Sequence, residues 1–189
     1  MQQRLPKAQR REQLLETAMT IVREEGTDAL TLGYLAERAG ISKPIAYTHF
    51  ETRSGLLIAL AKQIDDRALV TFKEACQRAP KKLKELARVA GAAYMHCYIT
   101  TGPEWQAIWA ALKGDAETDG FQQELVDRYA NAFLETFAPF SELPKEELHL
   151  RCIGIVGAAE GISREMLSHR IDEPTAAATL TSLIVKWLG

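Results

Sequence analysis

The chain has 189 residues, of which 47% are hydrophobic and 25% charged, a balance that fits a folded globular protein and excludes general disorder. Its formal net charge is -2, but the first 11 residues hold four basic side chains and no acid, which leaves a net -6 for the rest. No apolar run approaches the ~18 residues of a membrane span. Three widely spaced cysteines do not suit a disulfide framework. We therefore expect a cytoplasmic protein with buried thiols.

Three helices are predicted in the first 52 residues. The first spans about residues 9–25, and the second about 31–39. In the second, apolar residues recur at i, i+3, i+4 and i+7 and form one stripe, and Thr31 is placed to cap the N-terminus. The stripe consists of Leu32, Leu35, Ala36 and Ala39.

A tight turn follows at Gly40, because glycine tolerates the left-handed conformation that ends a helix. Ser42 is expected to cap a third helix, about residues 43–49, through the amide of Ile45, since Pro44 has no amide hydrogen. Residues 31–50 therefore predict a helix-turn-helix motif, in which the second helix enters the major groove of DNA.

A family signature surrounds this motif in residues 10–57. Its residues are Thr31 to Ala36, Ala39 to Lys43, Tyr47, His49-Phe50, Arg53 and Leu56-Leu57. They resemble the N-terminal signature of the tetracycline-repressor (TetR) family of bacterial regulators. The resemblance implies a repressor acting as a homodimer, in which the last two helices of each subunit pair as a four-helix bundle. Gly33-Tyr34 departs from the family, which usually has a polar or charged pair there.

The DNA contacts are expected from the third helix and its surroundings. Candidates for base edges are Lys43, Pro44, Ile45 and Thr48, because lysine donates to guanine, apolar groups pack on the thymine methyl, and threonine can do either. The resemblance implies phosphate contacts at Thr31, Tyr47, His49 and Arg53. The basic N-terminal segment adds Arg4, through phosphate or the minor groove. The alternative for this segment is a solvated terminus without a binding role.

Six more helices are predicted after residue 52, at about 52–78, 82–100, after Pro103, 121–138, 145–169 and 174–188. Their aromatic residues are candidates for lining a ligand cavity, or they simply fill the core. The ligand candidates are Tyr94, His96, Tyr98, Trp105, Trp109, Tyr129 and Phe133. They predict a mostly apolar effector that His96 and Tyr98 would orient.

Small residues lie three and four apart in the helix at 145–169, on one face. They are Gly154, Gly157, Ala158 and Gly161. Such a face lets another helix approach closely, and we expect a dimer interface. Close packing within one subunit is the alternative.

Enzymatic interpretations lack support, because the chain carries no GxxxxGK, GxSxG or HExxH motif and its four histidines are scattered. No metal or cofactor is expected. The sequence predicts an all-α protein with a DNA-binding domain at 1–52 and a helical ligand-binding and dimerisation domain at 53–189. Its expected function is that of a ligand-responsive repressor on a palindromic operator. The alternative is a DNA-bound scaffold that recruits a protein partner without small-molecule control.

Overall fold

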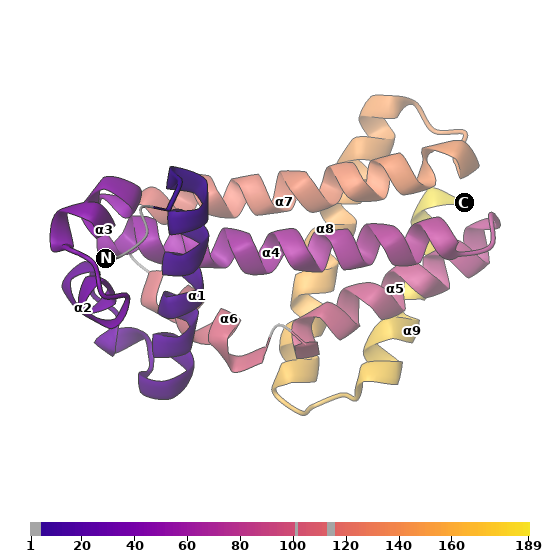
Figure 1. Ribbon diagram of the computed structural model, residues 1–189. Helices are drawn as coiled ribbons and strands as arrows, with labels where there is room; N and C mark the ends of the chain where they lie inside the picture. Colours follow the sequence, from indigo (N-terminus) through magenta and orange to yellow (C-terminus); the bar gives the residue numbers. More distant parts are fainter. Residues whose placement is uncertain (1–4, 101, 113–115) are drawn as a thin grey trace. The chain divides into compact units, whose positions relative to one another are not determined.

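The computed structural model describes residues 5–100, 102–112 and 116–189, with backbone alone at 102–103 and 116–119. In these residues the chain forms α-helices and two short 3-10 helices and no strand, which confirms the all-α prediction (Figure 1). The helices are α1 (Lys7–Glu25), α2 (Leu32–Arg38), α3 (Lys43–Phe50), α4 (Arg53–Arg78), α5 (Leu83–Thr100), α6 (Gly102–Leu112), α7 (Ala116–Phe137), α8 (Lys145–Leu167) and α9 (Glu173–Leu188).

The predicted helix ends are close to the observed ones except at α7. This helix begins at Ala116 and continues through Gly120, whereas the predicted helix begins at about residue 121. The short 3-10 helices, Thr27–Ala29 and Ala138–Phe140, were not predicted. No helix in the described ranges is long and apolar enough to span a membrane.

The helices group into two compact units. One comprises the chain up to residue 64 together with residues 102–121, and the other comprises residues 65–101 and 122–189. The helices α4 and α7 contribute to both. The predicted boundary after residue 52 falls at the start of α4, whereas the grouping by contacts adds the first half of α4 and α6 to the N-terminal unit.

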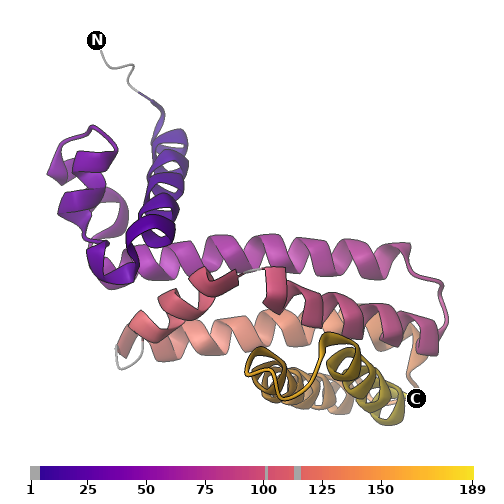
Figure 2. The same ribbon diagram turned by 90° about the horizontal axis from the view of Figure 1, so that it is seen from below.

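The N-terminal unit is built around the apolar stripe of α1. Figure 2 shows α1, α2 and α3 together, in indigo and purple. Leu35 of α2, Ala46 of α3 and Phe50 at the end of α3 are buried, so the two short helices share one small core with α1. The α1 residues in this core are Leu14, Leu15, Ala18, Ile21 and Val22. Burial of this stripe, rather than helix propensity, holds such short helices in place.

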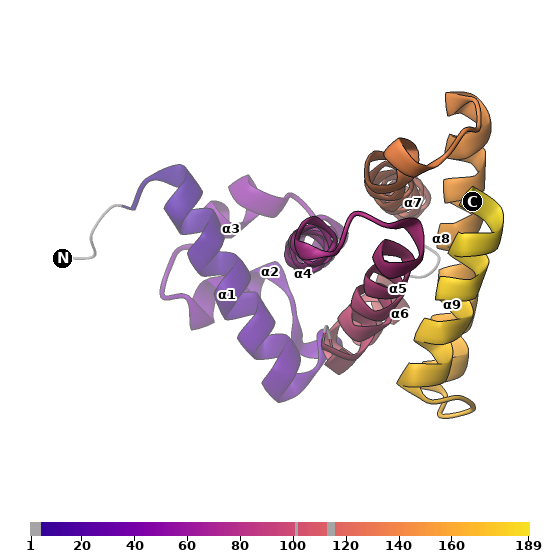
Figure 3. The ribbon, with the colours of Figure 1, turned by 90° about the vertical axis from the view of Figure 1, so that its right-hand side faces the viewer.

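The larger unit is centred on α5, which packs against α9 and α8, and Figure 3 shows α8 and α9 side by side. Its core is rich in aromatic residues from three helices, with Phe72 in α4, Tyr94 in α5 and Phe133 in α7. The thiols of Cys76, Cys97 and Cys152 are buried, as predicted, and burial raises the pKa of each to about 11. These thiols are therefore protonated at neutral pH and chemically inert.

Candidate DNA-binding site

The turn between α2 and α3 has the geometry that the sequence predicted. Gly40 adopts a left-handed φ of +65°. The amide of Ile41 donates to the carbonyl of Ala36 at 2.9 Å, and the amide of Gly40 donates to that of Glu37 at 3.0 Å. This double closure satisfies carbonyls that the helix end leaves without partners. The direction of α3 is therefore set by the turn itself.

The two predicted helix caps have different outcomes. The Thr31 side chain accepts a hydrogen bond from the amide of Tyr34 at 3.1 Å, which confirms its capping role. Its hydroxyl can still donate, as a phosphate contact requires. The prediction for Ser42 was wrong, because the amide of Ile45 donates to the Ser42 carbonyl at 3.0 Å and the hydroxyl makes no cap bond. Because the Ser42 carbonyl already accepts from this amide, the Ser42 hydroxyl is not needed to cap α3.

The outer face of α3 carries the predicted base-reading residues in exposed positions. Ile45 is 38% exposed, and Tyr47, predicted to contact phosphate, is 52% exposed, although both side chains are large and largely apolar. Pro44 is also exposed, and the Thr48 hydroxyl donates to its carbonyl at 2.8 Å. These apolar groups are positioned for contact outside the domain, which base edges and the thymine methyl would supply.

Lys43, at the start of α3, extends across α2. A Cβ added at Gly33 would lie 3.6 Å from Cε and 3.8 Å from Nζ of Lys43, so the lysine side chain packs against the first turn of α2. The exposed Lys43 ammonium is thus held near the N-terminal ends of both motif helices. Helix N-termini attract anions, and a lysine there adds positive charge to the same surface.

Basic residues of α1 lie near the other end of α3. The pKa of His49 is lowered, first by burial and then by the positive charges of Lys7, Arg11 and Arg10. His49 Nδ1 is buried and has no hydrogen-bond partner within the described part of the chain. A neutral imidazole leaves Nε2 as the nitrogen that can meet a phosphate. The described part of the basic segment therefore adds its charge to the same surface, whereas Arg4 lies outside the described residues.

Arg53, predicted to contact phosphate, makes contacts inside the domain. Its Nε donates to the carbonyl of Leu30 at 2.9 Å, and Nη2 donates to that of Thr27 at 2.7 Å. The half-buried guanidinium thus ties the start of α4 to the loop before α2. Of its five N–H donors, these bonds use two, so the group retains donors for a phosphate.

Substitution of Arg53 separates these two roles. We expect Arg53→Ala to lower the free energy of unfolding by about 1–3 kcal/mol, because two carbonyls lose a charged donor. The same variant should weaken binding to all DNA sequences and reduce the salt dependence of binding by about one ion. Urea denaturation and fluorescence anisotropy at several salt concentrations measure the two effects. An unchanged salt slope in a folded variant would contradict the phosphate contact.

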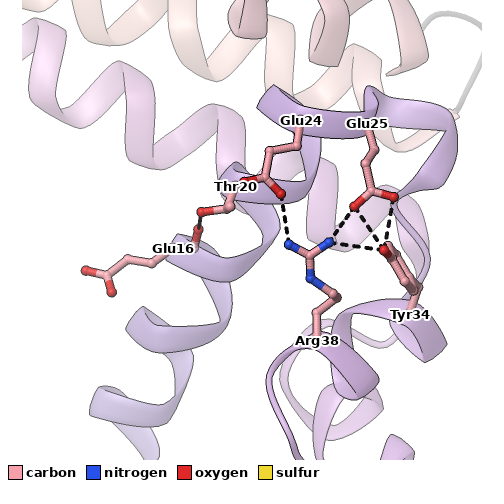
Figure 4. Close-up of polar contacts among 6 residues, drawn as sticks. All are labelled: Glu16, Thr20, Glu24, Glu25, Tyr34 and Arg38. Carbon is pink, nitrogen blue, oxygen red and sulfur yellow. Dashed lines mark hydrogen bonds and ion pairs between the residues drawn. The ribbon is translucent and has the colours of Figure 1, made fainter.

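A polar network that the sequence analysis did not predict joins α2 to the end of α1 (Figure 4). Arg38 Nη2 lies 2.9 Å from Glu24 Oε2, and the Tyr34 hydroxyl donates to Glu25 Oε1 at 2.9 Å. Arg38 Nη1 completes the network by contacting both Glu25 and the Tyr34 hydroxyl. Tyr34 therefore serves to position α2, which gives its departure from the family pattern a structural reason.

The structure brings together four of the seven predicted ligand residues, namely Tyr94, Tyr98, Tyr129 and Phe133, which all lie in the larger unit. Trp105 and Trp109 instead stack on each other, with Trp109 also packing on Phe121, in the N-terminal unit. The exposed His96 pairs through Nδ1 with Glu173 Oε1 at 3.1 Å. The two tryptophans thus belong to the N-terminal unit, and His96 is engaged with Glu173 of α9.

The glycine face of α8 divides into an inner and an outer part. A Cβ at Gly154 would lie 2.7 Å from the ring of Trp187, so this glycine packs against α9 in the same subunit. Added Cβ atoms at Gly157 and Gly161 would meet nothing within 4 Å. Ala158 between them is partly exposed. Packing within the subunit therefore explains Gly154 but not Gly157 and Gly161.

Three comparisons with known proteins agree with this geometry. Residues 14–60 match the family model "Bacterial regulatory proteins, tetR family". Over 182 residues the chain is 25% identical to HTH-type transcriptional regulator BetI from Klebsiella pneumoniae. The alignment covers 94% of this chain and 92% of BetI. The fold is similar to a TetR-family transcriptional regulator from Streptomyces coelicolor, with a TM-score of 0.67 and 21% identity over 97% of this chain and 80% of that one.

A further solved structure of similar fold is the multidrug binding protein EbrR complexed with imidazole. Its TM-score is 0.69 at 18% identity, and the match covers 92% of this chain and 94% of that one. The segment that matches the family model is the same helix-turn-helix whose exposed face is suited to the major groove, and the similarity to transcriptional regulators extends over nearly the whole chain. The chain therefore carries the helix-turn-helix domain of the TetR family at residues 14–60, and over nearly its whole length it is similar to HTH-type transcriptional regulators.

Proposed function

We propose that the protein is a cytoplasmic homodimeric repressor that binds a palindromic operator and is released from it by a small molecule. The observation that carries the proposal is the group formed by Tyr94, Tyr98 and Tyr129 in the larger unit, which places phenolic hydroxyls in an aromatic core. Polar groups within an otherwise apolar interior are typical of ligand-binding sites. The similar fold of EbrR, named a multidrug binding protein, supports the same function.

The homodimer is supported by the outer face of α8. Leu150 is 67% exposed and Trp187 of α9 is 42% exposed, and both are large apolar side chains. Gly157 and Gly161 on α8 leave open space beside them. A second copy of α8 and α9 would cover this face, and the glycines would permit close approach of the helices.

The mechanism of release follows from the dimer. Two reading helices must reach half-sites about 34–36 Å apart, so a ligand that favours another separation lowers operator affinity. A ligand that binds the DNA-incompetent form 100-fold better shifts the equilibrium by only ~2.7 kcal/mol. Such a ligand releases the protein from an operator of moderate affinity, but not from one that it binds very tightly.

The first requirement is a specific DNA contact, which Lys43 tests. An operator is first selected from random double-stranded DNA with the full-length protein. Lys43→Ala should then cost about 1–3 kcal/mol of binding free energy and relax the preference at one base pair of each half-site. Binding curves on all single-base variants of the operator measure both effects. If Lys43→Ala lowers the binding free energy equally on every operator variant, Lys43 contacts a phosphate instead of a base.

The alternative function is a DNA-bound scaffold that recruits a protein partner without small-molecule control. A thermal-shift screen of apolar and aromatic metabolites and drugs, followed by operator-release assays, separates the two functions. The repressor proposal expects at least one ligand that raises the melting temperature and lowers operator affinity. A reporter gene placed behind the operator gives the sign of regulation. Ligands that stabilise the protein but never alter operator affinity would favour the scaffold.

A further inference from the structure

The larger unit contains a buried carboxylate that the DNA-binding function does not use. Asp65 of α4 is 5% exposed, and no other charged side chain in the described residues is as buried. Arg128 Nη1 of α7 lies 2.8 Å from Asp65 Oδ2, and the same guanidinium also pairs with Asp66. The N–H of Arg128 is not aligned with Oδ2, which accepts no hydrogen bond in the part of the chain that the structure describes.

Burial is the main influence on this carboxylate. It raises the pKa of Asp65 to about 6, although Arg128 and a hydrogen bond from Tyr129 act in the opposite direction. A buried oxygen that accepts no hydrogen bond is costly, and a donor brought by a ligand would relieve that cost. Arg128 supplies positive charge to Oδ2 but no aligned N–H, so a ligand with an N–H or O–H group could complete the hydrogen bonding of this oxygen.

Three tyrosine rings form one group, which Tyr129 joins to this carboxylate through its hydrogen bond to Asp65. The ring of Tyr94 is 5.6 Å from that of Tyr98 and 5.2 Å from that of Tyr129, measured between centroids. Tyr94 is buried, whereas Tyr98 and Tyr129 are partly exposed and can be reached from outside. Burial raises the pKa of all three hydroxyls, so the rings are neutral phenols with electron-rich faces.

A second carboxylate reaches the same group from α8. Glu160 is partly buried, and burial raises its pKa, which the positive charge of Arg164 opposes. Its negative charge in turn contributes to the raised pKa values of Tyr94 and Tyr98. Arg128 is the cation paired with Asp65, and it is shared with Asp66. Three carboxylates, Asp65, Asp66 and Glu160, are thus balanced by two guanidinium groups, Arg128 and Arg164, which leaves one negative charge in excess.

We propose that Tyr94, Tyr98 and Tyr129, together with Asp65 and Glu160, bind an organic cation with an apolar body, such as a protonated aromatic or alkyl amine. The ammonium would donate to Asp65 Oδ2 and lie against the tyrosine faces, where a cation is attracted to the ring quadrupole. Its apolar part would pack on the surrounding aromatic core. An anion of the same shape would be repelled. The inference rests on the proposed ligand response and names the chemical class of the effector.

A matched pair of probes tests the charge requirement. The full-length protein is titrated by calorimetry with 4-phenylbutylammonium and with 4-phenylbutanol, which share the ring and the chain and differ in charge. We expect the ammonium to bind about tenfold or more tightly than the alcohol. Equal affinities, tighter binding of the alcohol, or no binding of either probe would overturn the proposal.

Substitutions locate the site. Asp65→Asn and Glu160→Gln should each weaken ammonium binding by about tenfold and leave alcohol binding unchanged. Glu135→Gln is the matched control, because this exposed carboxylate of α7 pairs with Lys73. Circular dichroism checks that each variant is folded. If Asp65→Asn unfolds the protein, Glu160→Gln still tests the site, because Glu160 is partly exposed and its substitution disturbs the core less. A charge preference that survives in Glu160→Gln and in a folded Asp65→Asn would place the site elsewhere.

The same titrations on the operator complex separate this inference from the proposed function. If the ammonium binds with the expected preference but leaves operator affinity unchanged, the cation site stands and the ligand-controlled release fails. If the alcohol alone binds and releases the operator, ligand control stands and the cation site is overturned.

Discussion

Replacement of Gly157 by leucine is expected to give a monomer that keeps its helical content and binds the palindromic operator about a hundredfold or more weakly. Inside the subunit the new side chain meets no obstacle, because a Cβ at this position has nothing within 4 Å. In the proposed dimer the leucine would push the two α8 helices apart. A monomer then loses the gain in effective concentration that a second reading helix provides.

Light scattering gives the mass of this variant, circular dichroism its helix content, and anisotropy its operator affinity. Ala92→Leu is the matched control, since it adds the same side-chain type at an exposed position of α5. The control should remain dimeric and bind normally. If Gly157→Leu also remains dimeric, the glycine face of α8 is not the subunit interface.

Gly55→Ala is expected to destabilise the N-terminal unit by about 1–3 kcal/mol and to weaken operator binding, although alanine is the better helix former. A Cβ at Gly55 would lie 2.3 Å from the carbonyl oxygen of Phe50, which is the last residue of the reading helix. Backbone atoms cannot move aside as the end of a flexible side chain can. The added methyl group would therefore shift the end of α3.

Gly33→Ala in the same domain provides the comparison. Its Cβ would meet Lys43 Cε at 3.6 Å, which is ordinary van der Waals contact. Because the glycine costs up to ~1 kcal/mol in a helix interior, this variant should match or exceed the wild-type stability. Urea denaturation of both variants measures the difference. Equal stability of Gly55→Ala and the wild type would show that α4 can adjust without disturbing α3.

The sequence was sufficient for the helix-turn-helix because its determinants are local. Thr31 and Gly40 act within a few residues of themselves, and the spacing between them limits α2. The cap expected from Ser42 failed because a backbone carbonyl can satisfy the same amide. Local patterns establish that a turn occurs more reliably than they establish which atoms close it.

The ligand candidates required information that periodicity does not hold. Tyr94 and Tyr129 come from helices whose pairing depends on long-range packing. Trp105 stacks on Trp109, four residues further along α6, and only the assignment of this helix to the N-terminal unit depends on long-range contacts. Asp65 was missed because it stands beside Asp66 and looks like part of a charged surface. A signal was present, however, since Asp65 continues the buried stripe formed by Leu57, Ala61 and Phe72 of α4.

The inert thiols of the core make the chain suitable for site-directed spin labelling. With pKa values near 11, Cys76, Cys97 and Cys152 would react slowly with thiol reagents, and all three are also shielded by burial. A cysteine placed at the exposed Glu37 of α2 would therefore take a nitroxide selectively in the otherwise native protein. In a dimer, the distance between the two nitroxides would report directly how far apart an effector holds the reading helices.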